Sequence, residues 1–123
     1  MQSLRELQVW QKGHALTLVV CKATATVPSS ERYGITSQLR RSAASIGANN
    51  AEGCGRVGGA DFARFLQVSM GSTSELEYHR LLARDLHLIT EEVYQNFNEH
   101  ITDVKRMLAA LTQTVRGSGP PRK

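Results

Sequence analysis

The chain has 123 residues, of which 41% are hydrophobic and 21% charged, a balance typical of one folded domain and not of a disordered chain. Three prolines, 6% aromatic residues and rare β-branched runs favour an all-helical fold. The net charge of +4 permits an acidic partner, and two cysteines are too few for a disulfide framework. With no signal-like segment and no apolar run near about 18 residues, we expect a cytoplasmic protein without membrane spans.

The first predicted helix runs from about residue 7 to residue 26, because apolar side chains recur there at helical intervals. They are Val9, Leu16, Val19, Val20, Ala23 and Val27. Pro28 and the serines after it end this helix and make a turn. A second, mixed apolar surface lies beside the first stripe and exceeds what one bundle core needs. It comprises Trp10, Leu18, Cys21 and Ala25.

The second predicted helix, residues 35–52, is built mainly from small and polar residues. Its apolar stripe is Ile35, Leu39, Ala43 and Ile46, and its polar stripe is Gln38, Arg41, Ser45, Asn49 and Glu52. Alanines and Gly47 fill most of the remaining surface, which lets helix axes approach below the usual ~8–10 Å. Two interpretations remain open, close packing inside a bundle or a surface for a ligand or second subunit. The candidate interface or close-packing residues are Trp10, Gln38, Ser45, Gly47, Asn49 and Glu52.

A glycine-rich link, residues 53–59, connects the second helix to the third. Residues 53–58 match the pattern GxGxxG, which in a dinucleotide site follows a strand and opens a helix. Here a helix precedes it and no strand-like run is present, so the pattern predicts a turn. We expect Gly53 or Gly55 to take the left-handed conformation that ends many helices.

The third predicted helix opens after Gly59 and continues to about Leu88, with Asp61 in its first turn, where a carboxylate suits the helix dipole. The fourth begins after Thr90, a good N-cap. Its apolar residues step alternately by three and four positions, which is an a/d seam. They are Tyr94, Phe97, Ile101, Val104, Leu108, Leu111 and Val115.

Short connections between four long amphipathic helices predict an all-α, antiparallel up-down-up-down four-helix bundle over residues 4–115. The tail, residues 116–123, contains glycine, proline and three basic residues but no apolar anchor. We expect that tail to be disordered.

No constellation of catalytic or metal-binding residues is evident. The four histidines lack metal-ligand spacing, no serine has a GxSxG setting, and no ExxH pair supports a di-iron site. We therefore expect a protein that is not an enzyme and has no metal or cofactor.

Basic residues gather in one part of the sequence. Between residues 32 and 64 five arginines stand against two acidic residues, whereas between residues 75 and 92 five acidic residues stand against two arginines. The candidate nucleic-acid-binding residues are Arg32, Arg40, Arg41, Arg56 and Arg64. Two alternatives stay open, because these arginines can instead be solvated or form salt bridges, such as one between Arg41 and Glu52. Arg40 and Arg41 also diverge by about 100° on a helix.

Three segments, together with the final amphipathic helix, resemble a known family. They are LQVWQKGHAL (7–16), YGITSQLRRSAASIGANNAEGCGR (33–56) and FLQVSMGSTSELEYH (65–79). They are similar to the small four-helix-bundle proteins encoded by intervening sequences of large-subunit ribosomal RNA genes. The family commonly has proline where Gly47 stands and isoleucine where Asn50 stands. Glycine in place of proline predicts a straighter or more flexible second helix. Asparagine in place of isoleucine removes an apolar contact and indicates a wetter interface.

The resemblance implies a four-helix bundle that often assembles into a homopentameric ring. One relative, the accessory variability determinant of diversity-generating retroelements, implies binding to nucleic acid and to a reverse transcriptase. We therefore expect a homo-oligomer, a pentamer by this resemblance, that binds RNA or DNA or a reverse transcriptase-like protein. The alternative is a protein-only assembly module without nucleic-acid contact.

Overall fold

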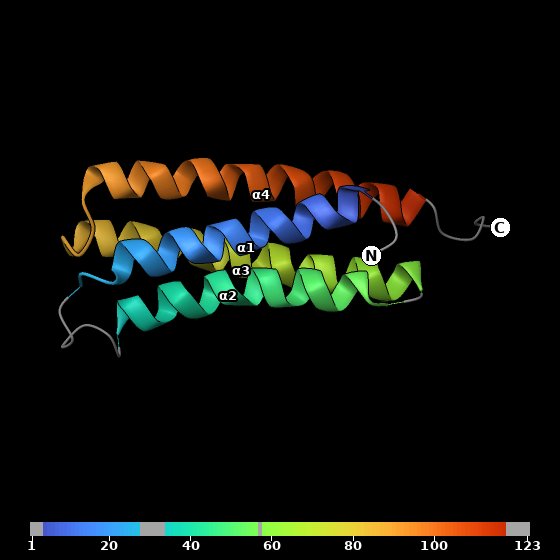
Figure 1. Cartoon of the computed structure of the whole chain (residues 1–123), viewed down its shortest axis with the longest axis horizontal. Helices are drawn as coiled ribbons and strands as arrows, with labels where there is room; N and C mark the ends of the chain where they lie inside the picture. Colours follow the sequence, from blue (N-terminus) through green and yellow to red (C-terminus); the bar gives the residue numbers. More distant parts are fainter. Residues whose placement is uncertain (1–3, 28–33, 57, 118–123) are drawn as a thin grey trace.

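The computed structural model describes residues 4–27, 34–56 and 58–117. These residues form four helices and no strand: α1 (Leu4–Thr24), α2 (Ile35–Cys54), α3 (Gly59–Asp85) and α4 (Glu91–Gly117). Successive helices lie side by side in opposite directions, and α4 packs back against α1 (Figure 1). The predicted all-α, up-down-up-down four-helix bundle is confirmed.

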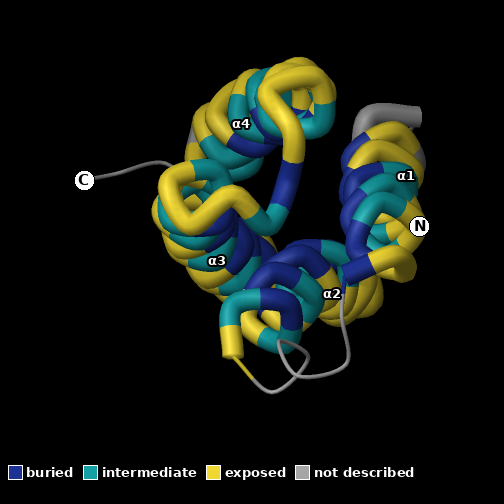
Figure 2. Tube along the Cα trace, turned by 90° about the vertical axis from the view of Figure 1, so that its left-hand side faces the viewer, coloured by how far each residue is buried: buried dark blue, intermediate teal, exposed yellow. Residues whose placement is uncertain are grey.

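Most of the predicted apolar positions face a common interior (Figure 2). The seam of α4 is buried from Phe97 to Leu111, and its two end residues, Tyr94 and Val115, are partly buried against the core. The fully buried large side chains of the other helices include Leu16 of α1, Ile46 of α2 and Leu66 of α3. The 3.6-residue period therefore placed the core correctly.

The helix ends differ from the sequence prediction by a few residues. α1 begins at Leu4 and α4 continues through Arg116 and Gly117, two residues beyond the predicted limit of the bundle. The rest of the predicted disordered tail, residues 118–123, lies outside the described residues, as does the predicted turn at residues 28–30.

α3 ends at Asp85, three residues earlier than predicted, because His87 takes a left-handed conformation with φ of 58°. The His87 N–H donates to Arg84 O and the Leu88 N–H donates to Ala83 O, both at 2.9 Å. These two bonds form a Schellman cap, in which His87 takes the left-handed position that glycine usually occupies. The sequence pattern missed this end because histidine stands where glycine is expected.

The prediction of a left-handed glycine at the end of α2 is wrong. Gly55 has φ of −83° and ψ of −5°, and no described glycine has a positive φ. Gly53 lies inside the helix and is buried, and a Cβ added there would lie 3.0 Å from atoms of Phe62 and Phe65. Glycine at position 53 therefore serves close packing of α2 against α3.

The closest approach of α1 to α2 occurs at Gly13. A Cβ on Gly13 would lie 2.9 Å from Asn50 Nδ2 and 3.5 Å from the Cα of Gly47. A Cβ on Gly47 would lie no nearer than 3.8 Å to any neighbour, which is ordinary van der Waals contact. Of the small residues of α2, Gly47 faces this neighbour, whereas Ala44, Ala48 and Ala51 are exposed. A side chain at Gly13 would require the Asn50 amide to move.

Polar contacts on both sides of this crossing fix the antiparallel register of α1 and α2. In four of them a side chain on one helix donates to a backbone carbonyl of the other. They are Cys54 Sγ to Glu6 O (3.7 Å), Asn50 Nδ2 to Val9 O (3.2 Å), Thr17 Oγ1 to Ala43 O (3.1 Å) and Arg40 Nη2 to Cys21 O (3.3 Å). The residue numbers of each pair sum to about 60, as one continuous antiparallel register requires.

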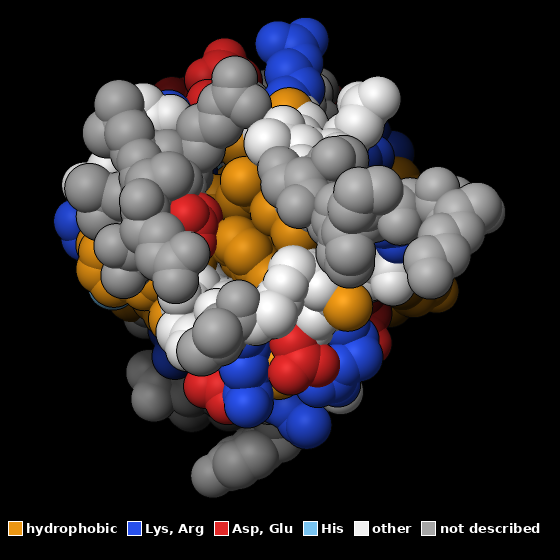
Figure 3. All heavy atoms as spheres, turned by 90° about the vertical axis from the view of Figure 1, so that its right-hand side faces the viewer, with side chains coloured by type: hydrophobic (Ala, Val, Ile, Leu, Met, Phe, Trp, Pro, Cys, Tyr) orange, Lys and Arg blue, Asp and Glu red, His pale blue; other side chains and the backbone are white. Residues whose placement is uncertain are grey.

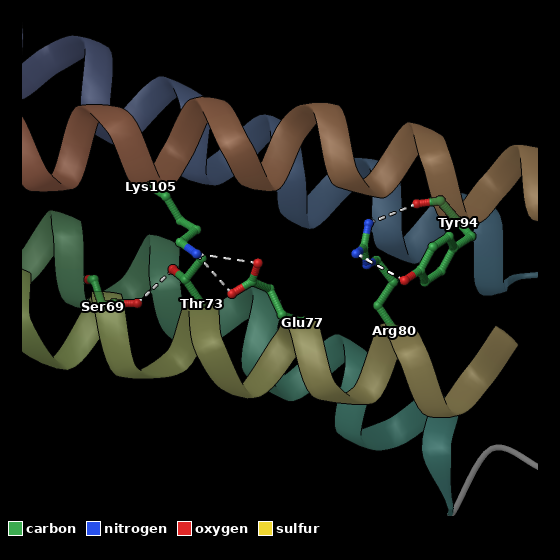
Figure 4. Close-up of polar contacts among 6 residues, drawn as sticks. All are labelled: Ser69, Thr73, Glu77, Arg80, Tyr94 and Lys105. Atoms are coloured by element: carbon green, nitrogen blue, oxygen red, sulfur yellow. Dashed lines mark hydrogen bonds and ion pairs between the residues drawn. The ribbon is translucent and has the colours of Figure 1, made fainter. Parts of the chain in front are cut away.

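Charged and aromatic side chains connect α3 to α4 (Figure 4). Lys105 Nζ of α4 lies 3.1 Å from Glu77 Oε1 of α3. Arg80 donates to the backbone and hydroxyl oxygens of Tyr94, both at 3.2 Å, and its guanidinium lies 4.0 Å from the centre of the Tyr94 ring. These contacts fix the axial register of α4 relative to α3.

Candidate nucleic-acid interface

Two of the predicted arginines meet at the end of the bundle where α2 passes into α3. The guanidinium carbon of Arg56 lies 4.9 Å from the centre of the Phe65 ring, and that of Arg64 lies 4.6 Å from it. Both distances suit cation–π contacts. Arg56 follows the last turn of α2 while Arg64 and Phe65 lie early in α3, so the chain reversal brings the three side chains together.

Each of these arginines also has an acidic neighbour. Arg56 Nη2 lies 2.7 Å from Glu52 Oε1, and Arg64 Nη2 lies 3.7 Å from Asp61 Oδ1. All four side chains are exposed, and exposed ion pairs contribute only about 0–1 kcal/mol. Figure 3 shows basic and acidic side chains interleaved along the rim of this end of the molecule.

The other predicted arginines do not join this group. Arg40 is half-buried, and its Nε donates to Thr24 Oγ1 at 2.9 Å, so it joins α1 to α2. Arg41 is exposed and has no salt bridge among the described residues, and Glu52, about 16 Å away along α2, pairs with Arg56 instead. Arg32 lies outside the described residues. Of the four predicted arginines that the structure describes, it brings together two.

The C-terminal half of α4 adds Arg116, which was predicted to lie in a disordered basic tail, and Arg106, which was not among the predicted residues. A Cβ on Gly59 would lie 3.6 Å from Val115 O, so the end of α4 lies beside the start of α3. Arg116 therefore lies at the same end of the bundle as Arg56 and Arg64, and Arg106 lies three turns earlier on α4. The sequence could have predicted the position of Arg116, because two antiparallel helices of equal length joined by a short turn bring the start of α3 and the end of α4 to the same end of the bundle.

The predicted interface or close-packing residues divide into two groups. Ser45 and Asn49 pack within the bundle: Ser45 Oγ lies 2.8 Å from Ser72 Oγ of α3, and Asn49 Nδ2 donates to Ser45 O at 2.8 Å. Gln38 and Glu52 remain exposed, and Gly47 is half-buried beside Gly13.

Trp10 belongs to the outer face of α1. It is half-buried and stacks on the exposed His14 ring, with ring centres 5.3 Å apart and planes 7° apart. Leu18, one turn further along the same face, is 44% exposed.

Asn50 is fully buried between α1 and α2. Its Nδ2 donates to Val9 O, while its Oδ1 has no partner among the described residues. A buried acceptor without a partner costs about 1–3 kcal/mol. The expected wetter interface does not follow, because Asn50 faces α1 inside the protomer.

The described residues contain no nucleophilic or metal-binding arrangement. Ser42 Oγ lies 3.4 Å from His79 Nδ1 but donates to Gln38 O at 2.6 Å, so the hydroxyl is committed to the backbone. Burial and the Glu6 carboxylate raise the pKa of the Cys54 thiol, which disfavours the reactive thiolate. No cluster of three or more His, Cys, Asp or Glu residues that could hold a metal occurs in this part of the chain.

A sequence profile of the 23S rRNA-intervening sequence protein family matches residues 5–110. The chain belongs to this family. As a family member it is similar in structure to a protein of unknown function from the S23 ribosomal protein family of Bacteroides thetaiotaomicron. The two share 23% identity and a TM-score of 0.83, over 89% of this chain and 99% of the other.

These comparisons assign the fold and the family, and they carry no enzymatic description. No curated protein matches the sequence. Among the described residues, no helix is both long enough and apolar enough to cross a membrane.

Proposed function

We propose that this protein is a non-enzymatic, cytoplasmic homo-oligomer that binds RNA or DNA, or a nucleic-acid-processing partner such as a reverse transcriptase-like protein, through a basic surface. The observation that carries the proposal is the meeting of Arg56 and Arg64 at Phe65, with Arg116 at the same end of the bundle. Guanidinium groups bind phosphates bidentately, and the Phe65 ring holds two of them close together.

Self-association would multiply this surface. The outer face of α1 carries Trp10, His14 and Leu18, and the register of the two helices places Ala44 and Ala48 of α2 beside them. A second copy of the chain would cover this apolar strip, and a closed ring, a pentamer by resemblance to the family, would repeat the basic end in each subunit. Weak phosphate contacts in several subunits then add through multivalency.

The salt dependence of RNA binding tests the proposal. Replacing Arg56 and Arg64 with alanine should weaken binding and reduce the slope of log affinity against log salt by roughly one unit per lost phosphate contact. The matched control, Arg56→Lys with Arg64→Lys, retains both charges and should retain most of the slope. A variant lacking residues 118–123 separates the contribution of the basic tail.

The alternative is a protein-only assembly module. Glu52 and Asp61 favour it, because each partly neutralises one arginine of the basic end. If the intact protein retains no RNA or DNA near ~50 mM salt, where phosphate contacts are strong, the alternative replaces the nucleic-acid proposal.

A further inference from the structure

The groove between α3 and α4 contains a small pocket near the basic end of the bundle. Its volume is about 270 Å³, and it is lined by Gln67 and Met70 of α3 and by Ala109, Thr112, Gln113 and Arg116 of α4. This volume is below the roughly 300–1,000 Å³ of pockets for drug-sized ligands, so it suits one ring system. An amphipathic helix would need a longer row of apolar contacts.

Three polar side chains that line this pocket are free to bind a ligand. The side chains of Gln67, Gln113 and Arg116 are exposed and have no hydrogen-bond or ion-pair partner in the part of the chain that the structure describes. Met70 and Ala109 supply apolar contact in the same pocket. A methionine thioether also makes favourable contacts with aromatic rings.

Positive charge surrounds the pocket. Arg116 lines it and Arg106 lies one helical turn before Ala109 on α4, whereas the guanidinium of Arg64 turns to Phe65 on the α2 side of α3. Asp61 accompanies Arg64, but Arg106 and Arg116 have no acidic partner among the described residues. The pocket therefore combines apolar contact for a flat ring, free amides for its polar edge and guanidinium groups for a phosphate.

We propose that this pocket binds a single unpaired nucleotide of single-stranded nucleic acid, with the base between Gln67 and Gln113 and the phosphate at Arg116 or Arg106. The inference rests on the proposed nucleic-acid binding and adds a preference for unpaired strands. Bases inside a duplex are stacked and paired, so they cannot enter the groove.

The test uses the full chain and a fluorescent uridine oligomer of about 12 nucleotides, compared with an abasic ribose-phosphate strand of the same length. The wild-type protein should bind the uridine oligomer about tenfold more tightly, as one or two hydrogen bonds from the free amides to the base would provide. Ala109→Phe fills the pocket and removes no charge, so it should reduce the uridine affinity to that of the abasic strand while the salt slope stays unchanged.

Ala110→Phe is the matched control, because Ala110 is also an exposed alanine of α4 but points about 100° away from Ala109. It should bind like the wild-type protein. Gln113→Ala, which adds no bulk, should also lower the uridine affinity, so the test stands even if Ala109→Phe folds poorly. NMR provides a direct assay of the pocket. Addition of a nucleoside monophosphate should shift the signals of the Gln67 and Gln113 side-chain amides.

The outcomes separate the two proposals. Equal wild-type affinity for the uridine and abasic strands, with normal salt dependence, overturns the pocket and leaves the proposed function intact. An equal loss of affinity in Ala109→Phe and Ala110→Phe also overturns the pocket. Failure of the wild-type protein to bind either strand near ~50 mM salt overturns both proposals.

Discussion

Gly13 shows how a residue without a side chain determines the packing of two helices. Its hydrogen atom faces Asn50, whose amide is fully buried and bonded to Val9 O and therefore cannot move without losing that bond. The α1–α2 crossing thus depends on glycine at position 13 and on an amide, not a branched apolar side chain, at position 50.

Gly13→Ala should accordingly lower the free energy of unfolding by about 1–3 kcal/mol, the usual cost of overpacking. Gly71→Ala is the control. A Cβ at position 71 meets nothing within 4 Å, so the helix should gain roughly 0.5–1 kcal/mol. Urea unfolding of the variants at one protein concentration gives the comparison. Equal effects of the two substitutions would show that α1 and α2 do not approach closely at Gly13.

The two cysteines should differ in reactivity because they differ in burial. Cys54 is buried and its pKa is raised, first by desolvation and then by Glu6, whereas Cys21 is half-exposed. Near pH 8 an aromatic disulfide reagent should label native Cys21 first, and the Cys21→Ser variant should react slowly until unfolded. Because folding favours the protonated thiol of Cys54, its contribution to stability is lost as pH rises past about 8.5. Rapid labelling of folded Cys21→Ser would contradict this burial.

At the scale of an element, the end of α3 is set by backbone conformation and not by side-chain pattern. His87 carries a Cβ in the left-handed region, where L-residues other than glycine are disfavoured by about 1–2 kcal/mol. The Schellman bonds and the packing of Leu88 and Ile89 against the core hold it there.

His87→Gly should therefore stabilise the protein by about 0.5–1 kcal/mol, since glycine adopts this conformation without strain and loses only part of the gain to chain entropy. His87→Ala keeps the Cβ and should bring no such gain. Thermal unfolding of both variants measures the difference. If alanine and glycine raise the melting temperature equally, the left-handed conformation at His87 is not the cause.

At the scale of the whole molecule, charge is distributed unevenly along the bundle. Arginines 56, 64 and 116 lie at the end that holds the α2–α3 connection, while Asp85, Glu91 and Glu92 lie at the α3–α4 turn, at the opposite end (Figure 1). Glu52 and Asp61 at the first end, and Arg84 at the other, reduce this contrast, so the proposed nucleic-acid contact depends on the placement of the three arginines more than on net charge.

Assembly through the outer face of α1 is testable by mass. We expect light scattering to give a multiple of the 13.6 kDa protomer, and Leu18→Glu to lower it by placing a charge in the interface. Leu86→Glu is the control, because Leu86 is 53% exposed but lies at the end of α3, away from this face. A wild-type mass of one protomer at micromolar concentration would refute the assembly, and equal effects of both variants would refute the surface.

The local spacing of apolar residues determined the helices of this protein and most of its core. The spacing of apolar residues predicted four helices, and the a/d seam of α4 identified its buried residues, because helical periodicity follows from backbone geometry alone. The short connections predicted the antiparallel bundle, because two long helices joined by a short link can bury their apolar stripes against each other only when they run in opposite directions. The resemblance of three segments and the final helix to a family was likewise visible in the sequence.

Tertiary structure decided which residues of each helix meet. Arg40 and Arg41 are adjacent in sequence, yet one joins α1 to α2 and the other faces solvent. Arg116 lies at the same end of the bundle as Arg64, although 52 positions separate them in the sequence. The same holds for Gly13, whose role depends on Asn50 across the helix crossing. Such pairings depend on the axial register of packed helices, which arises from many contacts between distant segments and leaves no local signal in the sequence.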